Sequence, residues 1–259
     1  MSDAILVVAF AGLLGAIVGS FLNVCILRLP SNQSIVRPAS RCPRCGQGVR
    51  WYDNIPVLSW LLLRGRCRHC RNPISIQYPL IELATALIWA GCAYHYGYEL
   101  DAARAAVFFT LLLGILMTDA QTMLIPHEFT VTGIVVGLAS SFLIGPPTPL
   151  LAAIGCLTGY GTLWIVGELG KRWKGREAMG GGDLMMMAMV GAFLGVVPVF
   201  LTIFLGAVVG TVVFGPVALL RREKNLELPF GVFLALGAAI TFLWGDAVIN
   251  WYRHYLGGN

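Results

Sequence analysis

Two acidic residues lie at the edges of apolar segments, where a carboxylate can take part in chemistry. Asp119 ends one such segment, and Asp183 follows directly on three glycines (Gly180, Gly181 and Gly182). An ionisable residue in a membrane-spanning segment is costly and is by default a functional candidate. Two facing carboxylates suit peptide hydrolysis, because one takes a proton from an attacking water while the other, protonated, polarises the scissile carbonyl. The positions of Asp119 and Asp183 permit such a pair.

Position alone leaves a second interpretation open for these acids. Both can be helix-end carboxylates in the lipid headgroup region, where the helix dipole favours an acid at an N-terminus. The three glycines favour a site, because a run without side chains resists regular helix and lets a substrate backbone approach closely. Glu82 also opens an apolar segment and is either a first-turn acid or a third residue of the site.

Four of the seven cysteines form two CxxC motifs, Cys42 with Cys45 and Cys67 with Cys70, separated by 21 residues. This is close to the spacing of four-thiolate zinc sites, in which each motif gives two sulfurs to one tetrahedral ion. The alternative is two disulfides, but the charge distribution described below places this segment in the cytoplasm, where thiols stay reduced. Four thiolates fill the coordination shell, so we expect a structural zinc ion.

The composition indicates which elements position these residues. Of the 259 residues, 57% are hydrophobic and 12% are charged, and the mean hydropathy is +0.76. These values exclude a disordered chain, a collagen-like repeat and a DNA-binding domain, and they argue against a soluble core. Several apolar segments have a length close to the roughly 20 residues that a helix needs to cross a bilayer. They predict an all-α polytopic membrane protein. We expect about eight transmembrane helices, at 4–27, 78–97, 103–119, 128–145, 149–170, 183–197, 199–220 and 229–250, although 183–220 is alternatively one interrupted helix.

The basic residues predict the orientation of these helices. Residues 28–77 contain nine arginines and one acid, Asp53, which gives a net charge of +8. Seven more basic residues follow the fifth and seventh predicted helices, whereas only Arg104 and Arg253 lie on the other side. Because basic loops stay in the cytoplasm, we expect 28–77 to be a small cytoplasmic domain and both termini to be outside. The expected division is a first transmembrane helix at 1–27, the cytoplasmic domain at 28–77 and a membrane domain of about seven helices at 78–259.

Taken together, these motifs resemble the prepilin leader peptidases of type IV pilus and type II secretion systems, which are GxGD intramembrane aspartyl proteases. The resemblance covers nearly the whole chain, and its blocks occur in order at matching spacing. The blocks are Gly19-Ser20-Phe21-Leu22-Asn23-Val24, Arg28-Leu29-Pro30, Ser40-Arg41-Cys42-Pro43-Arg44-Cys45, Trp51-Tyr52-Asp53-Asn54-Ile55-Pro56, Arg64-Gly65-Arg66-Cys67-Arg68-His69-Cys70, Pro73-Ile74-Ser75, Tyr78-Pro79, Glu82, Asp119, Ile125-Pro126, Gly180-Gly181-Gly182-Asp183 and Leu228-Pro229-Phe230-Gly231.

The resemblance implies a bifunctional enzyme of the bacterial cytoplasmic (inner) membrane. Such an enzyme removes a short basic leader from prepilin or pseudopilin precursors at the cytoplasmic face and then methylates the new amino group with S-adenosylmethionine. The family's catalytic aspartates correspond to Asp119 and Asp183, and its cytoplasmic cysteine cluster corresponds to the four cysteines above. The implied partners are these precursors and the lipid bilayer, with no nucleic acid. Because a +8 domain repels a basic leader, we expect its arginines to face anionic lipid headgroups or an acidic residue early in the mature pilin.

The chain departs from the family pattern at two positions, and two other functions compete with the peptidase. Family members often carry an acid after Ile-Pro and a lysine shortly after the Gly-x-Gly-Asp aspartate, whereas this chain has His127 and Met185. The peptidase assignment depends on neither difference. A proton-coupled transporter would place its acids near the membrane midplane in inverted repeats, and no repeat is evident. A non-catalytic assembly subunit would explain the cysteines but not the two aspartates.

Overall fold

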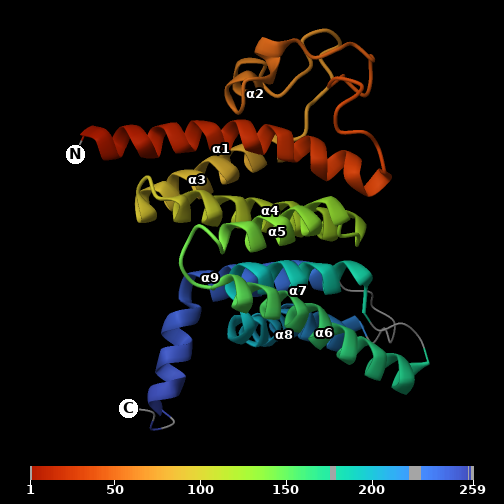
Figure 1. Cartoon of the computed structure of the whole chain (residues 1–259). Helices are drawn as coiled ribbons and strands as arrows, with labels where there is room; N and C mark the ends of the chain where they lie inside the picture. The colour runs from red at the N-terminus through yellow and green to blue at the C-terminus, as the bar shows by residue number, and fades with distance from the viewer. Residues whose placement is uncertain (1, 176–178, 222–228, 256, 258–259) are drawn as a thin grey trace. The chain divides into compact units, whose positions relative to one another are not determined.

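The computed structural model describes residues 2–175, 179–221, 229–255 and 257, and the regular structure within them is helical apart from two isolated β-bridges. The main helices run through the chain as Figure 1 shows. They are α1 (Ser2–Arg28), η1 (Leu29–Ser31), η2 (Trp51–Asn54), α2 (Leu58–Leu62), α3 (Gln77–Tyr96), α4 (Leu100–Thr122), α5 (His127–Ser140), α6 (Pro149–Lys174), α7 (Gly181–Leu194), α8 (Val196–Arg221) and α9 (Phe230–Tyr255).

The expected all-α membrane architecture is confirmed, since a helix overlaps each of the eight predicted ranges. Five segments in the described part of the chain are long and apolar enough to cross a membrane: Ala4–Ser31, Leu100–Thr122, Pro149–Trp173, Val196–Val213 and Phe230–Tyr255. Helix α7 is apolar but shorter. The total of eight spans therefore remains a prediction. Arg176, Arg222, Lys224 and Leu228, which entered the charge and motif arguments, lie outside the described residues.

The chain divides into two compact units, Met1–Thr110 and Leu111–Asn259, with the boundary inside α4. In the first unit α1 packs closely along α3. A Cβ atom added at Gly15 would lie 2.7 Å from the carbonyl oxygen of Thr85, and one at Gly19 would lie 2.8 Å from Cα of Glu82. Glycines four positions apart allow two helix backbones this close approach.

Helix α7 forms the core of the second unit. Met186, Met187 and Met189 are fully buried, and glycine contacts bring neighbouring helices against them. A Cβ atom at Gly191 would collide with the backbone of Gly155 in α6. Gly195, at φ 83°, ends α7, and α8 begins at the next residue, so 183–220 forms two helices and not one.

Candidate active site and cysteine cluster

Asp119 lies in the last turn of α4, buried with 5% of its surface exposed. Its Oδ2 accepts a hydrogen bond from the backbone N–H of Val232, at 3.0 Å, and the Gly231 N–H also contributes. Both donors belong to the first turn of α9, which starts just after Pro229. A Cβ atom at Gly231 would lie 2.9 Å from the same Oδ2, so only glycine leaves room for the carboxylate. The start of α9 therefore holds Asp119.

Asp183 lies in the first turn of α7 and is partly exposed. The structure brings it near enough to Asp119 for the charge of one carboxylate to act on the other. The two acids, 64 positions apart in the sequence, therefore lie within electrostatic range of one another, Asp119 at the end of α4 and Asp183 at the start of α7. This is the arrangement that the sequence permitted.

The segment between α4 and α5 joins the elements around the two acids. A Cβ atom at Gly182 would lie 2.8 Å from Cβ of Ile125, and one at Gly231 would lie 2.7 Å from Cδ1 of the same side chain. Ile125 therefore packs between the starts of α7 and α9. Gly181 differs from its neighbour, because it is exposed and a Cβ atom there would meet nothing within 4 Å. Of the three predicted glycines, Gly182 is needed for packing and Gly181 faces open space.

Sequence reasoning missed the contributions of Val232, Gly231 and Ile125 to this site. Residues 228–231 and 125–126 were noted only as family blocks. The proline directly before α9, Pro229, is a local signal that could have pointed to this helix start.

The four cysteine sulfurs gather in one place, all within 4.8 Å of one another, in the first unit. The Sγ atoms of Cys42 and Cys70 are 3.7 Å apart. Four sulfurs each about 2.3 Å from a single ion would lie about 3.8 Å apart, so the cluster fits a tetrahedral metal site. All four thiols are free in the structure, and none of them forms a disulfide. The cluster is therefore able to hold a metal ion.

Both CxxC motifs adopt the same turn. The N–H of Cys42 donates to the carbonyl oxygen of Gln47 at 2.9 Å, and that of Cys67 donates to Asn72 at 2.8 Å. Each turn also ends in a short antiparallel bridge, Arg41 with Gly48 and Arg66 with Pro73. The domain thus presents its four sulfurs from two copies of one local structure.

Backbone N–H groups prepare Cys42 to bind a cation. The N–H groups of Cys45 and Arg44 lower the pKa of the Cys42 thiol to about 6. At Cys70 the N–H of Asn72 acts in the same direction, but desolvation and the neighbouring thiols raise the pKa to about 11. Four crowded thiols do not all ionise alone, since each thiolate opposes the next. A bound cation would remove that opposition.

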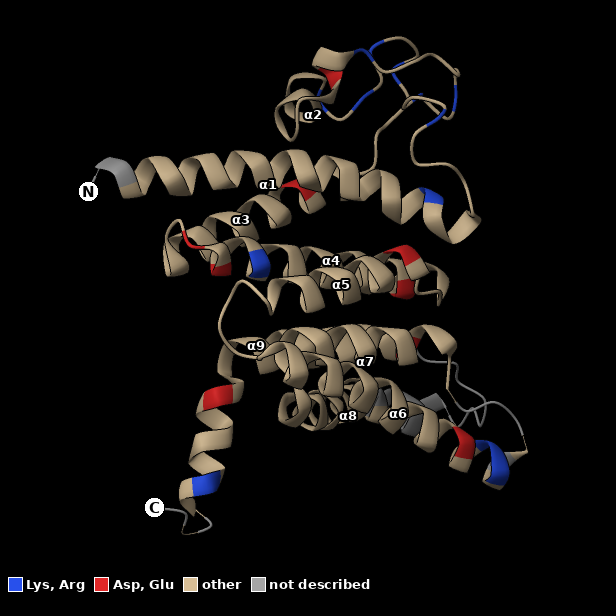
Figure 2. Ribbon diagram, viewed as in Figure 1, with Lys and Arg blue, Asp and Glu red and all other residues tan. Residues whose placement is uncertain are grey.

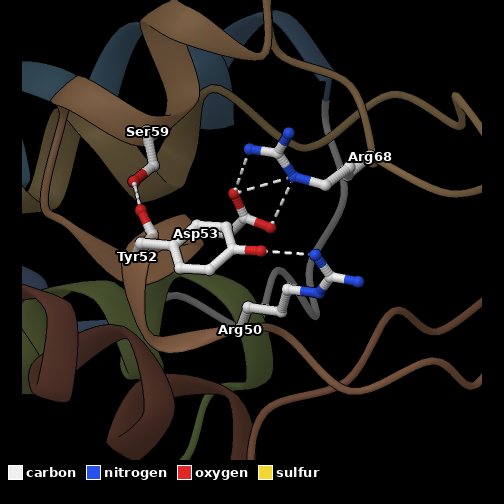
Figure 3. A network of polar contacts seen from close by, with 5 residues as sticks. All are labelled: Arg50, Tyr52, Asp53, Ser59 and Arg68. Atoms are coloured by element: carbon white, nitrogen blue, oxygen red, sulfur yellow. Dashed lines mark hydrogen bonds and ion pairs between the residues drawn. The ribbon is translucent and has the colours of Figure 1, made fainter.

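An ion-pair network fixes η2 to the second CxxC turn (Figure 3). Arg68 donates from Nη2 to Oδ1 of Asp53 at 2.6 Å and from Nε to Oδ2 at 2.9 Å. This pair lowers the pKa of the Asp53 carboxyl. Arg68 also lies over the ring of Tyr52, 5.5 Å from its centroid, and Arg50 donates to the Tyr52 hydroxyl. Figure 2 shows the basic residues concentrated in this domain, and in the sequence Asp53 is the one acid of residues 28–77.

Glu82 lies in the second turn of α3, in the first unit, and is 8% exposed. Its Oε2 accepts a hydrogen bond from the backbone N–H of Val57, at 2.6 Å. Val57 immediately precedes α2, so this carboxylate ties the cysteine domain to α3. The expected role of Glu82 in substrate contact or methyl transfer stays a prediction.

Comparison with known proteins identifies the family. Residues 13–96 match the bacterial peptidase A24 N-terminal domain, and residues 106–215 match the type IV leader peptidase family. A prepilin leader peptidase/N-methyltransferase of Xanthomonas campestris is 34% identical over 276 residues, which cover 96% of this chain and 95% of the relative. The chain belongs to the type IV leader peptidase family. The resemblance drawn from the motifs is thereby confirmed.

Other relatives of this leader peptidase family carry the same name. A prepilin leader peptidase/N-methyltransferase of Burkholderia pseudomallei is 39% identical over 92% of this chain and 85% of its own length. One from Myxococcus xanthus is 44% identical over 71% of this chain and 55% of its own length. No solved structure matches the chain.

Proposed function

We propose that this member of the leader peptidase family cleaves the basic leader from type IV prepilins and pseudopilins and then methylates the new N-terminal residue. The observation that carries the peptidase proposal is the buried Asp119 carboxylate, held by the start of α9 within electrostatic reach of Asp183. The names of the relatives support both reactions. The substrates would be single apolar helices with a short basic leader at the cytoplasmic face.

The surroundings of the two acids suggest different roles. Two backbone N–H groups and the N-terminus of α9 stabilise a negative charge on Asp119. Two close carboxylates do not both ionise readily, so Asp183 would carry the proton. Asp119 would then take a proton from the attacking water, while Asp183 donates its proton to the scissile carbonyl oxygen. Asp119 would next pass its new proton to the leaving nitrogen while Asp183 takes a proton back from a hydroxyl of the tetrahedral intermediate, so that the C–N bond breaks and both acids return to their starting states.

Gly181 offers the route by which a substrate backbone reaches the acids. It is exposed, and its α-carbon faces open space beside Asp183. An extended peptide backbone needs such a surface, because a side chain would hold it away from the carboxylates. Gly180 lies against Asp183, since a Cβ atom there would lie 3.1 Å from Oδ2 of that carboxylate.

Two further groups complete the proposal. Zinc suits the cysteine cluster, because four thiolates are its usual structural ligands, and the ion would order the 28–77 domain. S-adenosylmethionine would supply the methyl group, while the chain would hold the new amino group deprotonated. The protein would lie in the bacterial inner membrane, with the 1–27 helix and the 78–259 membrane domain flanking a cytoplasmic 28–77 domain, and with both termini outside.

The experiment that tests the peptidase proposal is leader cleavage in a purified system. Full-length protein in detergent is mixed with a model prepilin, without nucleotide or an ion gradient. Release of the leader at the expected bond supports the proposal. An intact precursor, under conditions in which a known family member cleaves it, would favour the transporter or the non-catalytic subunit.

A further inference from the structure

Four arginines line a cavity at the second CxxC turn, away from Asp119 and Asp183 in the chain. The cavity measures about 520 Å³, and its walls are Leu62, Leu63, Arg64, Arg66, Cys67, Arg68 and Arg71. Among the described residues, Arg68 is the one member of this set in an ion pair, with Asp53. The other three guanidinium groups add positive charge without a carboxylate beside them. The walls of the cavity therefore suit an anion.

The backbone at two of these arginines favours a different residue. Arg64 and Arg71 have φ angles of 51° and 59°, in the left-handed region that favours glycine. In the first CxxC turn the position equivalent to Arg71 is Gly46, with φ 69°. An arginine at such a position costs backbone energy that glycine would not. This points to a use for the two side chains that outweighs the cost.

Exposed leucines adjoin the same cavity. Leu58, Leu61 and Leu62 of α2 are 50%, 57% and 74% exposed, and Leu62 also lines the cavity. The hydrogen bond from the backbone N–H of Val57 to the Glu82 carboxylate fixes the start of α2 beside the second turn of α3. Glu82 lies five residues after the first residue of α3, which is a rise of about 7.5 Å along that helix. The start of α2 therefore lies alongside α3 and not beyond its end. An apolar surface next to basic side chains, beside the first turns of an apolar helix such as α3, is typical of a membrane interface.

We propose that this cavity binds the phosphate of an anionic phospholipid. Guanidinium groups pair well with phosphate oxygens because their donors form a planar fork. The leucines of α2 would rest at the boundary between headgroups and acyl chains. A free phosphate would use the arginines but leave the leucines unexplained, and for this reason a lipid is the occupant that the structure favours.

The test measures lipid binding to the purified full-length protein in a nonionic detergent. The probes are dioctanoyl phosphatidylglycerol, dioctanoyl phosphatidylcholine and inorganic phosphate, each titrated calorimetrically. The variant is Arg64→Gly combined with Arg71→Gly, since glycine relieves both backbones and the fold should not suffer. The matched control, Arg37→Gln with Arg44→Gln, removes the same charge from residues that do not line the cavity.

We expect phosphatidylglycerol to bind more tightly than either other probe. The glycine variant should weaken its binding by at least tenfold, because each arginine near an anionic surface contributes about fivefold. The control should bind almost as the parent protein does, and the melting temperature of both variants should be retained. Unchanged binding by the glycine variant, or equal weakening by the control, would overturn the site. Phosphate or phosphatidylcholine binding as tightly as phosphatidylglycerol would overturn the anionic lipid as its occupant.

Discussion

Asp119 is held by a residue that lies 113 positions later in the chain. Its position at the end of an apolar segment is visible in the sequence, and so is its separation of 64 positions from Asp183. The donor that meets it, Val232, is not visible, because the contact depends on how α4 and α9 pack. Local sequence shows that a carboxylate stands at a helix end, but it does not show which other helix end satisfies it.

Replacing either carboxylate with an amide should abolish cleavage. In the Asp119→Asn and Asp183→Asn variants the amide can neither take the proton from water nor supply one to the carbonyl. We expect a loss of at least about 10³-fold in leader cleavage, of the order of removing a proton-transfer group. The measurement is conversion of a model prepilin by purified variants with matched circular dichroism spectra.

Glu168→Gln serves as the control for both amide variants. In the described part of the chain Glu168 pairs with Arg172, one helical turn away on α6, and that ion pair is exposed. Its replacement should leave the cleavage rate almost unchanged. Near-normal cleavage by either Asn variant would return that aspartate to the helix-end interpretation.

Gly231→Ala should impair cleavage without removing a catalytic group. The added methyl would lie 2.9 Å from Oδ2 of Asp119 and 2.7 Å from Ile125, so the carboxylate must shift. A displacement near 1 Å costs up to about a hundredfold in rate. The measurement is kcat for prepilin cleavage, beside Gly161→Ala, where the new methyl meets nothing within 4 Å. Equal rates for the two alanine variants would show that Gly231 does not position Asp119.

Among the elements, the CxxC turns were the most predictable from sequence. Their spacing indicated one four-sulfur cluster, and the structure brings all four sulfurs together. The equivalence of the two turns was less apparent, because Gly46 and Arg71 occupy the same left-handed position with very different side chains. The spacing of the cysteines predicted the cluster, whereas the shared backbone geometry is apparent only in the structure.

Helix ends were less predictable than helix locations. Helix α5 was expected at 128–145 and α7 at 183–197, but each is 14 residues long. Apolar composition continues beyond both helices, so hydropathy does not register the break. The left-handed φ of Gly195 ends α7, and glycine alone gives no certain sign of this.

Protein purified without a chelator should contain about one zinc ion per chain, the stoichiometry of a four-thiolate site. Cys42→Ser or Cys67→Ser should lower the metal content, because a three-sulfur site binds the ion less tightly. The measurement is metal analysis by mass spectrometry, with Cys92→Ser as the control, since Cys92 is buried in α3 away from the cluster. Metal-free protein with all four thiols open to alkylation would contradict the zinc proposal.

At the scale of the whole molecule, the two proposed reactions draw on different parts of the chain. Asp119 and Asp183 belong to the second unit, whereas the cysteine cluster and Glu82 belong to the first. Hydrolysis needs an acid pair and water. Methyl transfer needs a deprotonated amine aligned with a polar donor from the cytosol. The chemistry itself therefore allows the two reactions to be separated by mutation.

We expect the Asp119→Asn variant to methylate a pre-cleaved peptide with a free N-terminus while failing to cleave the precursor. Cys67→Ser and Glu82→Gln should impair methylation more than cleavage, since Glu82 ties α3 to the cysteine domain. Radiolabelled methyl incorporation is measured beside leader cleavage for each variant. Loss of both reactions in the aspartate variant, with both retained in the other two, would favour a single shared site.

The close packing of α1 on α3 has a consequence for the affinity of the metal site. The cysteine domain is inserted between these two helices, so their glycine contacts already bring the ends of the inserted segment together. Closing a loop costs conformational entropy, and here the helix pair has met part of that cost before the sulfurs gather. A larger residue at Gly15 would separate the helices and raise the effective length of the loop. Metal affinity would then fall, although neither helix supplies one of the four sulfurs.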